Sequence, residues 1–187
     1  MLKQEAVHPL LRALWQPRLM DAIQWVIGEM AKDSGARRTP IAAEIKGTAA
    51  IAGVELKGKA DRIDRNPAGA LGIVDYKTGK APTLATIQAG FALQLGLLGL
   101  IAEAGGFPGV SGSVEEFEYW SFAGGGKRVI ADKKIEDFLG HARGLFEDAA
   151  ADWLTGMRPF TAKLNPTFAP YGDYNQLMRL EEWYGRN

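Results

Sequence analysis

Two aspartates and a lysine surround one predicted hairpin, in the stretch GKADRIDRNPAGALGIVDYKTGK. Asp75 and Lys77 follow an apolar run, and because successive side chains of a strand point to opposite faces, these two share a face. Asp61 lies about as far before the turn NPAG as Asp75 lies after it. An antiparallel hairpin would therefore set the two carboxylates near each other at the ends of their strands.

Converging carboxylates with an amine beside them suit a hard divalent cation. Mg²⁺ prefers one or two carboxylates together with waters and substrate phosphate. The lysine then orients or deprotonates a water, or neutralises charge on a phosphoryl transition state. The same residue pattern also fits a plain surface ion pair, in which Asp75 and Lys77 pair with Arg62 or with a glutamate.

Composition narrows the chemistry further. Lys plus Arg equals Asp plus Glu, 22 against 22, so a nucleic-acid site requires local clustering of positive charge rather than an overall excess. The absence of cysteine excludes disulfides, thiolate zinc sites, a cysteine nucleophile and an iron–sulfur cluster. His8 and His141 lie far apart in sequence, which disfavours a His-rich metal site. With no long apolar run and no signal-peptide pattern, we expect a cytoplasmic protein without a membrane segment.

Hydrophobic periodicity predicts the elements that position these residues. A helix over 9–33 carries one apolar face and breaks at Pro17. An antiparallel meander follows, and a long apolar helix then leads to a strand that runs parallel to the third strand of the meander. The order predicts an α/β fold with a mixed central sheet flanked by helices. The remaining predicted elements are strands over 41–51, 54–65, 70–78, 113–122 and 128–132, helices over 83–105 and 133–156, and a short helix in the tail 157–187.

The motif block resembles the RecB-type exonucleases, a branch of the PD-(D/E)xK nuclease superfamily. That family has a strand ending in G-x-x-D-R-I-D, a strand ending in D-Y-K-T-G and a helix with a Gln-Leu pair. The counterparts here are ADRID at 60–64, DYKTG at 75–79 and Gln94-Leu95. The tail YGDYNQLMRLEEW and the helix HPLLRALWQPRLMDAIQWV are further similar to the C-terminal end of the AddB family, the nuclease-bearing subunits of bacterial AddAB helicase–nucleases.

This resemblance implies a restriction-endonuclease-like core and a set of roles. Asp61 and Asp75 would ligate Mg²⁺ or Mn²⁺, the carbonyl of Tyr76 would add a ligand, and Lys77 would act on the attacking water. Gln94 would line the site from its helix. The implied function is a metal-dependent DNA exonuclease in double-strand-break repair, with an AddA-like helicase–nuclease subunit as partner.

Three departures from the family pattern stand beside the resemblance. The chain lacks the G-x-x-x-H helix that precedes these strands in the family, and Leu98 replaces the tyrosine of Q-L-x-x-Y. The iron–sulfur cluster of some AddB proteins has no cysteines here. We therefore expect a single nuclease-like domain taken from a longer subunit, with a helical lead-in (1–40), a core (41–156) and a tail (157–187).

Two alternatives remain open at this point. The same fold without catalysis would bind DNA or dock a partner subunit. An unrelated α/β binding domain would leave Asp61 away from Asp75.

Several other residues have an ordinary structural interpretation. Glu44 is a solvated glutamate at a strand start rather than a further acid of the site, and Asp64 faces away from Asp61 and pairs with Arg62 or Arg65. GGGKR at 124–128 is a hairpin turn, because it lacks the spacing of a phosphate-binding loop. His141 is a surface or interface residue. Core packing is the expected role of the tryptophans at 15, 25, 153 and 183, with base stacking as the alternative.

Overall fold

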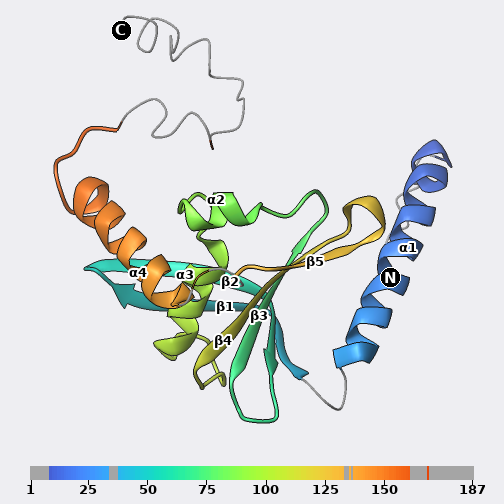
Figure 1. Ribbon diagram of the computed structural model, residues 1–187, viewed down its shortest axis with the longest axis horizontal. Coiled ribbons are helices and arrows are strands. Elements are labelled where there is room, and N and C mark those ends of the chain that lie inside the picture. Colours follow the sequence, from blue (N-terminus) through green and yellow to red (C-terminus); the bar gives the residue numbers. More distant parts are fainter. Residues whose placement is uncertain (1–8, 34–37, 133–134, 136, 161–167, 169–187) are drawn as a thin grey trace, which may run out of the picture.

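The computed structural model describes residues 9–33, 38–132, 135, 137–160 and 168, and Figure 1 shows their arrangement. Five strands form one sheet in the order β1-β2-β3-β4-β5. Helices cover both of its faces, so the predicted α/β fold with a mixed, helix-flanked sheet is confirmed. The strands are β1 (Thr39–Ile51), β2 (Val54–Arg65), β3 (Leu71–Lys77), β4 (Val114–Ser121) and β5 (Lys127–Ile130). The α-helices are α1 (Pro9–Asp33), α2 (Leu84–Gln88), α3 (Gln94–Glu103) and α4 (Phe138–Ala149).

The first three strands form the antiparallel meander that the sequence predicts. A two-residue turn joins β1 to β2, with Ile51 opposite Val54. Its residues Ala52 and Gly53 have φ of 51° and 74°. Positive φ at both turn positions matches the right-handed twist of the flanking strands, which explains the tight hairpin.

The prediction of one long helix over 83–105 is wrong, because the chain forms two helices there. Thr83 caps α2 through its side chain, which accepts from the N–H of Thr86, and the helix ends after Gln88. Gly90 then adopts φ of 80°, and an added Cβ would lie 2.8 Å from Leu145 of α4. The break makes Gln94 the first residue of α3. The crossover still leaves β3 and β4 parallel, as predicted.

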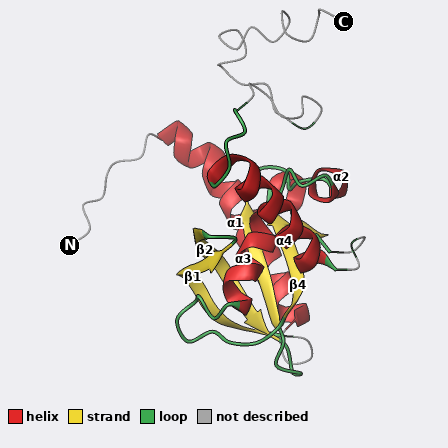
Figure 2. Cartoon of the chain, turned by 90° about the vertical axis from the view of Figure 1, so that its left-hand side faces the viewer, coloured by secondary structure: helices red, strands yellow, loops and turns green. Residues whose placement is uncertain are grey.

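The core lies between the sheet and the helices α3 and α4, which Figure 2 shows in front of the strands. Alternation along the strands sends one set of apolar side chains to this face. Removing them from water stabilises the fold by roughly 25 cal/mol per Å² of apolar surface. The largest fully buried side chains on this side include Ile63, Leu71, Ile73, Leu95, Leu100, Ile101 and Tyr119.

Helix α1 lies on the opposite side of the sheet (Figure 1). It runs through Pro17, so the predicted break at this proline is wrong. Trp25 packs edge-on against Trp120 of β4, with ring centroids 5.5 Å apart. The side of the helix that carries Leu19, Ile23 and Ile27 is exposed instead of buried.

Helix α4 begins later than the predicted 133–156 segment. The carboxylate of Asp137 accepts the N–H of Gly140 at 2.7 Å and caps the helix, which sets its start at Phe138. A π-helical turn at Ala150–Leu154 follows. The short helix predicted in the tail lies outside the described residues.

Candidate nuclease site

Asp61 and Asp75 meet where the β2–β3 hairpin opens. The paired positions end at Arg62 and Val74, so the next residues outward on the two strands are Asp61 and Asp75. Asp61 Oδ2 accepts the N–H of Tyr76 at 2.9 Å. A side chain thus replaces the backbone as the partner of this N–H, and the two carboxylates come together at the end of the ladder.

Asp75, Lys77 and Gln94 form a closed set of polar contacts. Lys77 Nζ lies 2.7 Å from Asp75 Oδ2 and donates to Gln94 Oε1 at 2.7 Å. Gln94 Nε2 donates to Asp75 Oδ1 at 2.5 Å. The amide of Gln94 has one orientation that satisfies both neighbours, because only its nitrogen donates and only its oxygen accepts. The start of α3 is thereby tied to the end of β3.

Burial dominates the electrostatics of Asp75, whose side chain is 3 % exposed. Burial raises the pKa of this carboxyl, and the negative charge of Asp61 raises it further. Lys77 and Gln94 oppose the shift and lower the pKa. Asp75 Oδ2 is buried and has no hydrogen bond, because Lys77 reaches it at ion-pair distance without hydrogen-bond geometry. A buried carboxylate oxygen without a hydrogen bond, next to a second carboxylate, fits a hard divalent cation.

Comparison with known proteins decides the family. The family model described as PD-(D/E)XK nuclease superfamily matches residues 2–169. The chain belongs to the PD-(D/E)XK nuclease superfamily. Members of this superfamily are generally nucleases and typically use Mg²⁺ or Mn²⁺. A search of the curated proteins finds no match for this chain. Within the described residues, no helix is long and apolar enough to cross a membrane.

The match to the PD-(D/E)XK superfamily does not assign roles to single residues. The structure brings Asp61, Asp75, Lys77, Gln94 and the main chain of Tyr76 to one place, and their roles stay a prediction. Two carboxylates converge there, and the described part of the chain holds no group of three or more acidic, histidine or cysteine side chains placed to bind a metal. Among the described residues, the Tyr76 carbonyl is the predicted further ligand to an ion, beside water and substrate phosphate.

Tyr119 belongs to this site and was not singled out from the sequence. It is the register partner of Asp75 on β4, and its ring lies under the Lys77 ammonium with 5.5 Å to the centroid. Its hydroxyl lies 3.5 Å from the carbonyl oxygen of Ala92, just before α3. Burial raises the pKa of this phenol, with a further contribution from the charge of Asp75. No motif spacing indicates Tyr119, since its position follows only from the parallel pairing of β3 with β4.

Leu98 stands where the family pattern has a tyrosine on the Gln helix. It is buried, and a Cβ added at Gly58 of β2 would lie 2.8 Å from its Cδ2 atom. An apolar residue fits this position because the side chain packs into the core. The aromatic ring in contact with the Lys77 ammonium comes from Tyr119 of β4 instead.

A buried ionic network occupies the other face of the same strands. Arg62 donates to both oxygens of Asp64, at 2.6 and 2.5 Å, and to the hydroxyl of Tyr76 at 3.2 Å. Arg38 reaches Asp64 at 3.2 Å and Glu118 at 2.8 Å. Asp64 is therefore a salt-bridge residue paired with Arg62, as the sequence predicts, and the network fixes the strands from behind the site.

Glu44 also lies close to the site, in a different position from the one expected. It lies inside β1 with φ of 53°, between Ala43 and Ile45, which pair with Arg62 and Ala60, and it forms an ion pair with Lys59. Its side chain is 64 % exposed, so the solvated interpretation holds. The three glycines of GGGKR form the turn before β5, as predicted, whereas Lys127 and Arg128 are the first residues of β5.

His141 and the tryptophans have varied surroundings. The imidazole Nε2 of His141 lies 3.1 Å from the Gln88 carbonyl oxygen, so this residue joins α4 to α2. The predicted core packing is confirmed for Trp25, which packs against the buried Trp120. It is wrong for Trp15, whose exposed fraction is 62 %. Trp153 is half-buried beneath the Arg158 guanidinium. Trp183 lies outside the described residues.

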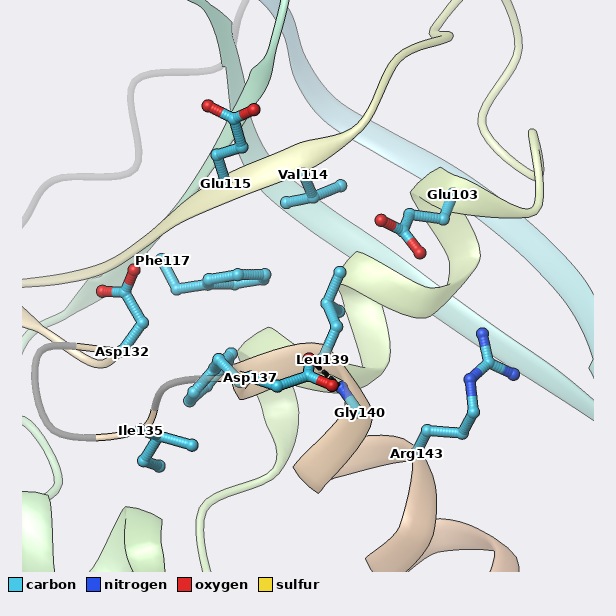
Figure 3. Close-up of a pocket in the computed structure, with 11 residues that line it drawn as sticks. Glu103, Val114, Glu115, Phe117, Asp132, Ile135, Asp137, Leu139, Gly140 and Arg143 are labelled. Atoms are coloured by element: carbon cyan, nitrogen blue, oxygen red, sulfur yellow. Dashed lines mark hydrogen bonds between the residues drawn. The ribbon is translucent and has the colours of Figure 1, made fainter.

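A separate cavity of about 510 Å³ lies at the other end of β4 (Figure 3). Glu103, Asp132 and Arg143 line it, and burial raises the pKa of Asp132. The cavity contains none of the candidate catalytic residues. Its acidic side chains, drawn in Figure 3, come from separate walls and do not form a metal-binding group among the described residues.

Proposed function

We propose that this chain hydrolyses DNA phosphodiester bonds with a divalent metal ion held by Asp61, Asp75 and the carbonyl of Tyr76. The convergence of the buried Asp75 with Asp61 and Lys77 supports this proposal. The ion, when bound, would activate a water and stabilise charge on the scissile phosphate.

The protein's own groups then have distinct tasks. Asp75 and Asp61 supply carboxylate oxygens where burial makes electrostatic interactions strong. The Lys77 ammonium has three N–H groups, of which one donates to Gln94, and the ammonium forms an ion pair with Asp75. N–H donors of Lys77 therefore remain for a water or a phosphate oxygen. Gln94 holds the carboxylate and the ammonium at a fixed separation, which reduces the reorganisation needed during reaction.

The finer assignment is exonuclease activity in an AddB- or RecB-like helicase–nuclease that repairs double-strand breaks in the cytoplasm. The DYKTG strand and the Gln-Leu helix support it. The exposed apolar side of α1, which carries Trp15, Leu19 and Ile27, supports contact with an AddA-like partner. The proposed catalytic residues all lie in the core, residues 41–156.

The deciding experiment is a nuclease assay on linear DNA with Mg²⁺ or Mn²⁺. We expect Asp75→Asn and Lys77→Ala each to lower the cleavage rate by about 100-fold or more, the scale of losing one preorganised electrostatic group. Asp148→Asn and Lys57→Ala are matched controls on exposed side chains and should retain activity. Equal activity in all four variants would refute hydrolysis at this site, whereas no metal-dependent cleavage by the wild-type protein would favour an inactive DNA-binding or docking module.

A further inference from the structure

A groove of about 730 Å³ opens near the end of β3, and its lining includes Ser121, the register partner of Lys77. One wall is the segment 80–84, which joins β3 to α2 and begins shortly after Lys77. The other wall is the β4–β5 hairpin, and Figure 1 shows both segments at the same end of the sheet. Ser121 Oγ donates to the Gly79 carbonyl at 2.7 Å, and the N–H of Phe122 donates to the Lys77 carbonyl at 2.9 Å. The groove is thus continuous with the end of the strand that carries Asp75 and Lys77.

The chain segments around this groove carry positive charge and no negative charge. Residues 76–102 and 119–131 contain no Asp or Glu, although the whole chain has 22 acidic residues. Arg128 is held by Glu118 and Glu29. Lys80 and Lys127 line the groove, are exposed, and form no ion pair within the part of the chain that the structure describes.

Most other described lysines are already paired with a carboxylate. Lys32, Lys57 and Lys59 pair with glutamates, and Lys77 pairs with Asp75. Two uncompensated ammonium groups in one groove create a local positive potential in a chain of zero net charge. Such a potential attracts a chain of phosphates.

The part of the groove lining that we call its floor is apolar. Pro82 and Leu84 contribute from one wall and Val129 and Ile130 from the other, and Ile130 is 47 % exposed. A duplex hides its bases in the stack and presents phosphates and sugars outward, so it has little to place on such a floor. A single strand offers both phosphates for the lysines and unstacked base faces for the apolar side chains.

We propose that this groove binds a single-stranded segment of the DNA substrate next to the cleavage site, with Lys80 and Lys127 on its phosphates. The inference rests on the proposed nuclease function and names its substrate class. The same strand would then run along the end of β3 past Lys77.

The test is equilibrium binding of the full chain, measured by fluorescence anisotropy in EDTA so that no cleavage occurs. The probes are a fluorescein-labelled single-stranded oligodeoxynucleotide and its matching blunt duplex. The variant is Lys80→Ala/Lys127→Ala, and the charge-matched control is Lys46→Ala/Lys57→Ala on exposed positions of β1 and β2. All substituted side chains are exposed, and thermal unfolding followed by circular dichroism verifies that each protein is folded.

We expect the groove variant to lose roughly 25-fold in single-strand affinity at about 0.1 M salt, from two lost phosphate contacts at about 0.7 units of salt slope each. The plot of log affinity against log salt should become less steep by about 1.4. The control should stay near wild type, and the duplex should lose less than the single strand. Equal losses in the groove variant and the control, or a duplex loss as large as the single-strand loss, would overturn the inference.

Failure of the groove and failure of the proposed function remain distinguishable. If the protein shows metal-dependent cleavage and the groove variant binds DNA as well as wild type does, the proposed groove is refuted and the proposed nuclease function stands. If the groove variant selectively loses single-strand binding while the wild-type protein cleaves with neither Mg²⁺ nor Mn²⁺, the groove is supported and the nuclease function is refuted.

Discussion

Replacing Gln94 by alanine tests whether the amide holds Asp75 in its charged form. Gln94 Nε2 donates to Asp75 Oδ1 at 2.5 Å, and this bond lowers a pKa that burial raises. A hydrogen bond to a charged group contributes about 1.5–3 kcal/mol, against about 0.5–1.5 kcal/mol for a neutral one. We therefore expect Gln94→Ala to cost about 1.5–3 kcal/mol at neutral pH, and less in acid.

The pH dependence has a defined sign. The folded-state pKa of Asp75 lies above its unfolded value of about 3.8, so its ionisation destabilises the fold. That penalty is absent below the unfolded pKa and grows as pH rises through the folded pKa. Without Gln94 the folded pKa rises further, so the difference between variant and wild type should widen from acidic to neutral pH.

Urea unfolding at acidic and neutral pH measures this difference directly. Gln88→Ala is the matched control, because Gln88 is exposed on α2 and uses its backbone carbonyl to contact His141. A Gln94→Ala cost that is the same at both pH values, or no larger than that of Gln88→Ala, would refute the assigned contact.

Two further pairs of substitutions test the surroundings of the site. Tyr119→Leu removes the ring beneath Lys77 and should lower kcat roughly tenfold, on the scale of about 0.5–2 kcal/mol for a cation–π contact, whereas Tyr119→Phe keeps the ring and most of the activity. Equal kcat values for the two variants in a single-turnover assay would contradict this role. Gly96→Ala places a Cβ against Ala142 and should cost about 1–3 kcal/mol in thermal unfolding. Gly144→Ala, with open space around it in α4, should stabilise by about 0.5–1 kcal/mol, and equal shifts would disprove close helix packing as the cause.

The strands and their antiparallel order were predictable because their signals are local. Alternating residues within β2, and turn residues between β2 and β3, define a hairpin without reference to the rest of the chain. The division between α2 and α3 was not predictable in this way. It depends on Gly90 taking a left-handed conformation against Leu145, a residue that lies far along the chain.

The same limit applies to α1. Its apolar spacing predicts a buried face, yet Leu19, Ile23 and Ile27 are exposed and Trp25 packs against the sheet. Periodicity shows that a helix has an apolar side, but tertiary contacts decide which side is covered. Pro17 likewise interrupts one hydrogen bond without ending the helix.

The sequence by itself determined that Asp61 and Asp75 meet, because counting residues on either side of a short turn sets which positions face each other in a hairpin. Only the tertiary structure decided that Tyr119 lies beneath Lys77, that Gln94 begins a helix, and that Lys80 and Lys127 share a groove. These neighbours come from a parallel crossover and from packed helices. Their register is set by the fit of distant side chains, and no local hydrogen-bond pattern specifies it.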